Sequence, residues 1–254
     1  MVLTVDIGNS NIALGGFDGD NAVFTAHIAT NTLETEDEYA CKLLSVLSLY
    51  DIDKNKIDGS VISSVVPQLN VTVKNALRFL LNIEPLVVGP GVKTGISIRC
   101  DSPSSVGADL ICASVAAHYI YERPALIVDL GTATKMTVVD GSGAFIGTSI
   151  MTGIAMGLDA LSNGTAQLPK VSLDAPDRIV AKNTVDCIKS GAIYGHSSMI
   201  DGMICRIKEE VGQDLSVIIT GGYAKAVLPY CKQKMILDEL LVLKGLNLIY
   251  KRNC

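Results

Sequence analysis

The chain has 254 residues, of which 48% are hydrophobic and 19% are charged, and its formal net charge is −5. This composition supports a packed core and excludes an intrinsically disordered chain. Trp is absent, aromatic residues make up only 5%, and no run of Lys or Arg stands out. DNA or RNA is therefore not expected as a partner, because a protein that neutralises many phosphates needs a basic surface.

Short runs rich in β-branched residues alternate along the chain with longer stretches of helical spacing. Strands are predicted at residues 3–5, 21–27, 60–66, 86–88, 125–128, 136–139 and 216–220. Helices are predicted at residues 36–49, 68–81, 105–119, 184–211, 223–231 and 238–250. Strands that alternate with helices indicate an α/β fold.

Two similar segments head the two halves of the chain. Asp6–Ser10 and Asp129–Thr134 each follow an apolar strand and each begins with Asp-x-Gly and a polar residue. The repetition predicts a duplicated fold with a cleft between the copies. Pro124 stops one helix just before the next strong strand, which places the boundary between a domain of residues 1–121 and a domain of residues 122–254.

Glycine at the end of a buried strand lets a turn present backbone N–H groups to a phosphate. Asn9, Ser10, Thr132 and Thr134 add side-chain donors. The carboxylates of Asp6 and Asp129 would repel phosphate, so a cation is expected between them and the phosphate. Mg²⁺ fits this role, because it is bound by one or two carboxylates together with phosphate oxygens. The alternative interpretation is a pair of ordinary Asp-x-Gly turns.

Two further features have a chemical and a purely structural interpretation. Gly221 and Gly222 follow a predicted strand and open a helix; they could accommodate a flat ring or a ribose, or simply form a tight turn. Asp109 lies at the start of an apolar helix, where a carboxylate is stabilised by the helix dipole. It could also accept a proton from a substrate hydroxyl during phosphoryl transfer.

The remaining polar side chains give weaker signals. The seven Cys form no C-x-x-C pair and are odd in number, which favours reduced thiols in the cytoplasm over zinc or disulfides. The three His are isolated and are interpreted as packing or surface residues, while Lys135 could touch a phosphate or point to solvent. Neither a signal peptide nor an apolar run near the roughly 18 residues of a membrane span is found, so no membrane association is expected.

Taken in order, the motifs resemble those of the type III pantothenate kinases. The resemblance rests on Asp6–Ser10, Ser63–Pro67, Gly107–Asp109, Asp129–Thr134 and Thr220–Gly222. Smaller matches extend it over nearly the whole chain: Asp37–Ala40, Thr165–Pro169, Asn183–Thr184, Ser190–Ala192, Ile200–Gly202 and Leu243–Leu246. It implies an actin-like (ribonuclease H-like) fold of two similar domains, a homodimer, and ATP-dependent phosphorylation of pantothenate to 4'-phosphopantothenate, the first step of coenzyme A biosynthesis.

The resemblance also implies cofactors and roles for individual residues. Mg²⁺ would accompany ATP, and a monovalent cation, K⁺ or NH₄⁺, would lie near Asp129, with Asp6 as the other metal-binding carboxylate. Asp109 would be the general base. The implied phosphate-binding and adenosine-binding residues are Asp6, Gly8, Asn9, Ser10, Asn11, Gly131, Thr132, Ala133, Thr134, Gly221 and Gly222. The implied pantothenate-binding residues are Cys100, Gly107, Ala108, Asp109 and Thr184, the last reaching across the dimer interface.

Two residues on the acceptor side differ from the family pattern. Leu110 follows Gly107–Asp109 where the family usually has Arg, and Cys100 stands where it commonly has Tyr. Two alternatives to pantothenate phosphorylation therefore remain. One is a kinase that acts on a different hydroxyl compound. The other is a nucleotide-binding regulatory protein without phosphoryl transfer.

Overall fold

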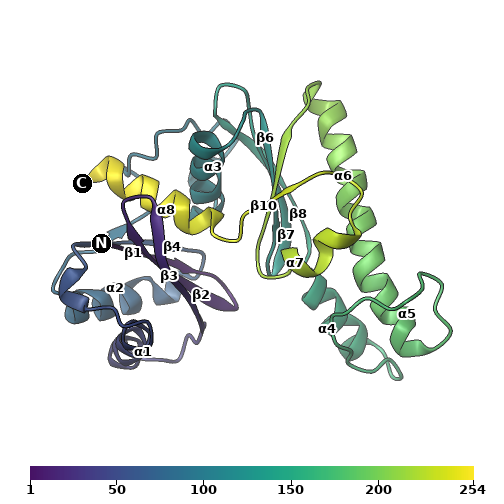
Figure 1. Cartoon of the computed structure of the whole chain (residues 1–254), viewed down its shortest axis with the longest axis horizontal. Coiled ribbons are helices and arrows are strands. Elements are labelled where there is room, and N and C mark those ends of the chain that lie inside the picture. Colours follow the sequence, from purple (N-terminus) through teal and green to yellow (C-terminus); the bar gives the residue numbers. More distant parts are fainter. The chain divides into compact units, whose positions relative to one another are not determined.

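The computed structural model describes residues 1–254 and contains two five-stranded sheets, one in each of two compact units (Figure 1). Unit 1 is made of Met1–Ser97, Asp101–Tyr119 and Leu240–Cys254. Unit 2 is made of Ile98–Cys100 and Ile120–Glu239. The chain therefore leaves unit 1 twice, and it returns at Asp101 and again at Leu240 for its last residues.

The sheet of unit 1 begins with three antiparallel strands. They are β1 (Val2–Ile7), β2 (Asn11–Asp18) and β3 (Asn21–Ala29). β4 (Gly59–Ser64) then pairs in parallel with β1, and β5 (Leu86–Val87) pairs in parallel with β4. The strand order is β3-β2-β1-β4-β5.

The sheet of unit 2 repeats this plan. β6 (Ala125–Leu130), β7 (Ala133–Val139) and β8 (Phe145–Thr152) are antiparallel neighbours. β9 (Ser216–Thr220) pairs in parallel with β6, and β10 (Ile236–Leu237) in parallel with β9, which gives the order β10-β9-β6-β7-β8. The same connectivity in both sheets confirms the predicted α/β class and the duplicated fold.

Helices cover both faces of the first sheet (Figure 1). α1 (Glu36–Leu49) starts at a capping box formed by Thr35 and Glu38, and α2 (Pro67–Leu81) starts at a proline that fits the first helical turn. Their apolar faces pack on Leu3, Val5 and Ile7 of β1. Because side chains alternate along a strand, Thr4 and Asp6 face the opposite side of the sheet.

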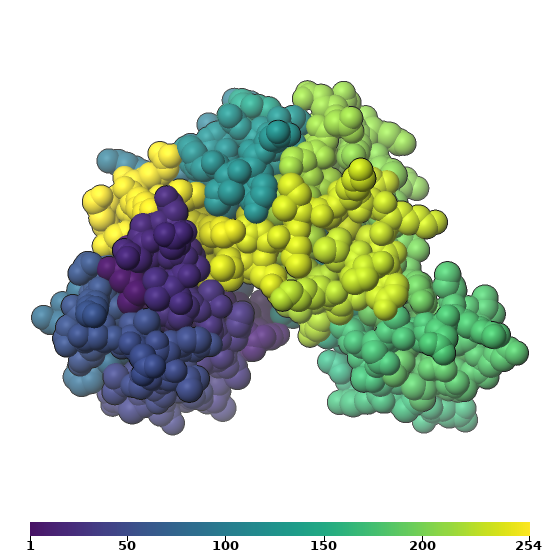
Figure 2. Space-filling model, in the orientation of Figure 1, coloured from purple at the N-terminus to yellow at the C-terminus, as the bar shows by residue number.

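That opposite side carries α3 (Ala108–Ile120) and α8 (Leu241–Asn253). α8 packs against β1, β2 and β4, and Figure 2 shows its yellow surface in contact with the purple surface of the first strands. At Gly245 the backbone of α8 approaches α3 so closely that a Cβ atom would lie 1.9 Å from the Cys112 carbonyl oxygen. The predicted domain of residues 122–254 included this helix, whereas its buried Leu243 and Leu246 place it with unit 1.

In unit 2 the helices are α4 (Ile154–Gly164), α5 (Thr184–Ser190), α6 (His196–Val211) and α7 (Ala224–Val227). The helix predicted at residues 184–211 is thus divided, and a π-helical turn at Gly191–Gly195 joins α5 to α6. Ile193 of this turn, with Ile200 and Ile204 of α6, packs on one face of the sheet. Short 3₁₀ turns lie at Lys54–Lys56, Pro103–Ser105 and Leu228–Tyr230.

Four strands and helices were not predicted as such: β2, β8, β10 and α4. The Gly15–Gly16 pair is typical of a turn, but both residues lie within β2, where a Cβ atom at Gly15 would meet Thr4 Oγ1 at 2.9 Å and one at Gly16 would meet the Phe24 ring at 2.3 Å. The glycines therefore admit neighbouring side chains rather than reverse the chain. None of the helices combines the length and apolar character that crossing a membrane requires.

Candidate active site

The turn between β1 and β2 is held by backbone contacts that leave its polar side chains on the surface. The Gly8 N–H donates to the Asn11 carbonyl at 3.0 Å, and a Cβ atom at Gly8 would lie 2.9 Å from that oxygen. Thr30 donates its hydroxyl to the Gly8 carbonyl at 2.6 Å. Asn9, Ser10 and Asn11 are exposed. The turn is therefore fixed in shape and presents three polar residues to solvent.

Two of the predicted carboxylates lie beside one buried thiol in unit 1. Cys112 of α3 is fully buried, and its pKa is raised well above the usual value, first by burial and then by the negative charges of Asp6 and Asp109. Asp6 comes from β1, opposite Ser63 of β4, and Asp109 comes from the first turn of α3. The packing of α3 on the sheet thus brings together two residues that are far apart in the sequence.

Asp109 has a defined local geometry. Its Oδ1 accepts the N–H of Leu110 at 2.8 Å, and a Cβ atom at Gly107 would lie only 2.5 Å from the same oxygen. Glycine at position 107 is therefore needed for the carboxylate to fold back over the start of the helix. Leu110 itself is 8% exposed, so this position contributes an apolar side chain to the interior and no charged donor to an acceptor pocket.

The second predicted turn, between β6 and β7, is built from three segments of unit 2 in close backbone contact. The Gly131 N–H donates to the Ala133 carbonyl at 3.1 Å. At the start of α4, a Cβ atom at Gly153 would lie 2.1 Å from the Thr132 carbonyl oxygen. Gly221 has φ of +94° and lies against Leu130, where a Cβ atom would come within 2.6 Å of the carbonyl. Only glycine fits these contacts without displacement.

Asp129 forms an ion pair with the residue that faces it across the β6–β7 ladder. Lys135 Nζ lies 2.7 Å from Asp129 Oδ2. Lys135 is only 17% exposed, so its side chain does not simply point to solvent. The ammonium group is directed at the carboxylate.

Thr134 contacts a histidine that sequence reasoning did not connect with the site. Its buried hydroxyl lies 2.8 Å from Nε2 of His196, the first residue of α6. Burial lowers the pKa of His196, which favours the neutral ring. No motif in the sequence signals this pair, because the two residues are 62 positions apart and meet only through the packing of α6 on the sheet.

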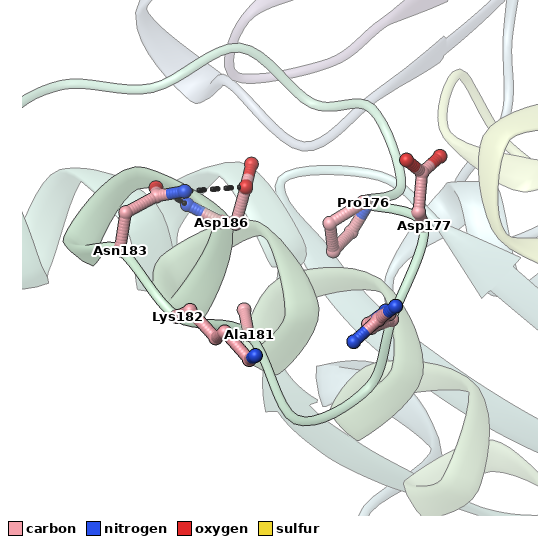
Figure 3. A pocket seen from close by; sticks show the side chains of 7 residues that line it. Pro176, Asp177, Ala181, Lys182, Asn183 and Asp186 are labelled. Carbon is pink, nitrogen blue, oxygen red and sulfur yellow. Dashed lines mark hydrogen bonds between the residues drawn. The ribbon is translucent and has the colours of Figure 1, made fainter.

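Cys100 and Thr184, which the family resemblance assigns to pantothenate, both lie in unit 2. Cys100 is partly buried in the short segment Ile98–Cys100 of unit 2, and Thr184 is exposed at the first position of α5. Figure 3 shows a hollow beside the start of α5 that is lined by residues 176–178 and 181–183 with Asp186. The Asn183 side chain caps α5, accepting from the Asp186 N–H at 3.0 Å and donating to its carboxylate at 2.7 Å.

Residues 2–206 match the family model described as type III pantothenate kinase. The chain belongs to the type III pantothenate kinase family. A curated type III pantothenate kinase of Syntrophus aciditrophicus (strain SB) is 40% identical over 253 residues, with 100% of each chain covered. Kinases of this family are phosphotransferases that use ATP together with a divalent metal.

Solved structures of lower sequence identity support the fold alone. A 2-dehydro-3-deoxygalactonokinase protein from Sinorhizobium meliloti superimposes with a TM-score of 0.60 at 12% identity, covering 99% of both chains. A protein described as a Baf family transcriptional activator from Campylobacter jejuni gives a TM-score of 0.58 at 22% identity, covering 99% of this chain and 98% of its own. Both likenesses agree with the duplicated actin-like architecture.

Proposed function

We propose that this chain phosphorylates pantothenate with ATP, forming 4'-phosphopantothenate in the first step of coenzyme A biosynthesis. Family membership supports the reaction class, since the similarity to a curated member extends over the full length of both chains. The structural observation that carries the proposal is the placement of Asp6 on β1, opposite Ser63 of β4, and of Asp109 in the first turn of α3. Burial and then the charges of both carboxylates raise the pKa of Cys112 there. A phosphate-side carboxylate and a candidate base therefore lie in one region of unit 1.

In this proposal the chain acts mainly by positioning. Asp109 holds the primary hydroxyl of pantothenate and accepts its proton, while the donors of the β1–β2 and β6–β7 turns, together with Gly8, Gly131 and Ala133, hold the phosphates of ATP. No group of three or more His, Cys, Asp or Glu forms a metal cage in the structure. Mg²⁺ at Asp6 fits this finding, because it takes few protein carboxylates and completes its shell with water and phosphate oxygens.

The other predicted contacts complete the proposal. Gly222 is exposed, with no atom within 4 Å of its would-be Cβ, so beside Gly221 it offers a flat surface to adenosine. Gly107, Ala108 and Cys100 are assigned to pantothenate. The monovalent cation implied at Asp129 does not fit so readily, because that carboxylate already holds the Lys135 ammonium.

A second copy of the chain is the proposed partner of exposed apolar side chains in unit 2. They include Ile150 of β8, Met156 of α4 and, in and before α5, Ile179, Val180 and Val185, with Val180 84% exposed. Thr184 adjoins Val185, so a homodimer that covers the start of α5 would let Thr184 reach the substrate of the partner. A strictly monomeric protein in analytical ultracentrifugation would contradict this part of the proposal.

The cytoplasm is the proposed location. All seven Cys are unpaired, and Cys41, Cys187, Cys205 and Cys254 are exposed. Exposed free thiols suit a reducing compartment.

The test is ADP release by the purified chain with MgATP and KCl, with and without pantothenate. Asp109→Asn should lower kcat by about 10²–10⁴-fold, as expected for loss of a general base, with nucleotide affinity nearly unchanged. Asp101→Asn, which alters an exposed carboxylate in the preceding loop, is the matched control and should retain full activity.

The same assay tests the alternatives. Buried Leu110 favours one specific second candidate, a kinase for a different hydroxyl compound, because it leaves the acceptor side without the usual guanidinium. Turnover with another alcohol but not with pantothenate would support that candidate. ATP binding without turnover on any acceptor would instead indicate a regulatory protein.

A further inference from the structure

The Asp129–Lys135 ion pair is largely withdrawn from solvent. The two side chains are 16% and 17% exposed, and their charged atoms lie 2.7 Å apart. Removing charges from water is costly unless each has its partner, so a pair at this depth depends on both members. The pairing is also imposed by the sheet, because Asp129 and Lys135 are directly opposite in the antiparallel register of β6 and β7.

The second oxygen of the Asp129 carboxylate faces the glycine turns. Oδ1 would lie 2.6 Å from a Cβ atom at Gly221 and 3.7 Å from one at Gly131. These glycines belong to the segments proposed to hold the phosphates and the adenosine of ATP. A bare carboxylate at this place would repel the incoming phosphate, so a positive charge on it is required for binding.

The equivalent position of unit 1 shows a contrast. In the duplicated topology β1 and β2 correspond to β6 and β7, and Asp6 faces Ala13 where Asp129 faces Lys135. Alanine supplies no charge there. Asp129 thus has a cationic residue opposite it on the neighbouring strand β7. The matching position of β2 gives Asp6 no charged residue.

We infer that Lys135 is the fixed monovalent cation of the nucleotide site, and that the unit 2 turn binds phosphate without K⁺ or NH₄⁺ from solution. A lysine ammonium carries the same single charge as NH₄⁺ and three N–H donors, and its tether removes the need to recruit a free ion. The inference rests on the proposed function, since it takes a nucleotide as the ligand of this turn.

The test measures nucleotide binding directly rather than activity. Affinity of the full chain for the magnesium complex of a non-hydrolysable ATP analogue is determined by titration calorimetry, with K⁺ replaced by tetramethylammonium at constant ionic strength. Wild type should bind equally well in both salts. Lys135→Ala should bind roughly tenfold or more weakly in tetramethylammonium, and K⁺ or NH₄⁺ should restore its affinity in a saturable manner.

Three further variants separate this role from a structural one. Lys135→Arg keeps the charge and should remain independent of K⁺. Asp129→Asn combined with Lys135→Ala removes the carboxylate as well, so the K⁺ requirement of the single variant should disappear. Lys189→Ala breaks an ion pair with Asp174 in which Lys189 is similarly buried, and it should leave nucleotide affinity and its salt dependence unchanged.

Thermal unfolding without nucleotide gives an independent readout. K⁺ should raise the Tm of Lys135→Ala, because an ion that binds only the folded state stabilises it, and should not raise that of wild type. Saturable K⁺-dependent nucleotide binding by wild type would overturn the inference but not the proposed function. The same holds if K⁺ fails to restore the nucleotide affinity of Lys135→Ala. Absence of nucleotide binding by wild type in either salt would overturn both the inference and the proposed function.

Discussion

Replacing Gly245 by alanine would insert a methyl group where α8 crosses α3. The added Cβ atom would lie 1.9 Å from the Cys112 carbonyl oxygen and 2.5 Å from its carbonyl carbon, whereas real Cβ atoms essentially never approach closer than 3.0 Å. The two helices must therefore separate by roughly 1 Å at this point, since both obstructing atoms belong to the backbone and cannot turn aside.

The expected change in the free energy of unfolding follows from two opposing effects. Alanine is favoured over glycine in a helix interior by about 1 kcal/mol. Overpacking of a tight interior costs about 1–3 kcal/mol and more where backbone must move, and here the shift also loosens the contacts of buried Leu243 and Leu246. A net loss of about 2 kcal/mol corresponds to a Tm lowered by about 4–8 °C for a protein of this size.

Thermal and urea unfolding measure this loss, and Gly202→Ala provides the matched control. Gly202 lies in the interior of α6, is exposed, and has no atom within 4 Å of its would-be Cβ. There the same substitution should stabilise the protein by about 0.5–1 kcal/mol. If Gly245→Ala is as stable as Gly202→Ala, the close crossing of α8 and α3 is not present and the reasoning fails.

Two further predictions concern unit 2. His196→Ala leaves the buried Thr134 hydroxyl without its partner and should destabilise the fold by about 1–3 kcal/mol, with His196→Gln recovering part of the loss in urea unfolding. Burial acts to raise the pKa of Asp140, but hydrogen bonds from Ser142 and Ala144, and the charge of Arg99, together hold it below its usual value. The stabilisation that ionised Asp140 gives the fold is therefore fully present above the pKa of Asp140 in the unfolded state. It is lost as the pH falls through the lower pKa of Asp140 in the folded state. The difference in unfolding free energy between wild type and Asp140→Asn should narrow below about pH 4, and a difference that is constant with pH would contradict this.

Local sequence signals were sufficient for the elements whose boundaries depend on local chemistry. α1 begins and ends where predicted because Thr35 and Glu38 form a capping box and Tyr39, Leu43 and Leu47 recur at helical spacing. The two Asp-x-Gly turns were predicted because a glycine directly after a buried strand is typical of a tight turn. β2 was not predicted, because Gly15 and Gly16 make room for Thr4 of β1 and Phe24 of β3, and no local pattern reveals contacts with neighbouring strands.

The contacts between side chains of the candidate site were largely beyond reach of the sequence. Asp109 and Asp6 were both selected, but their approach to Cys112 depends on which face of the sheet α3 covers. Lys135 was considered beside the second turn, yet its pairing with Asp129 follows from a strand register that only the structure supplies. Such non-local contacts are set by tertiary packing and not by spacing along the chain.

The return of α8 to unit 1 has a consequence for the order of folding during synthesis. α8 packs on β1, β2 and β4, so this unit is not complete until residues 240–254 have emerged from the ribosome. Unit 2 needs only Ile98–Cys100 and Ile120–Glu239, all of which are made earlier. Domains generally fold as they emerge, the N-terminal one first. In this chain the unit that is translated first is the last to be finished, because one side of its sheet stays uncovered by α8 until the final residues are made.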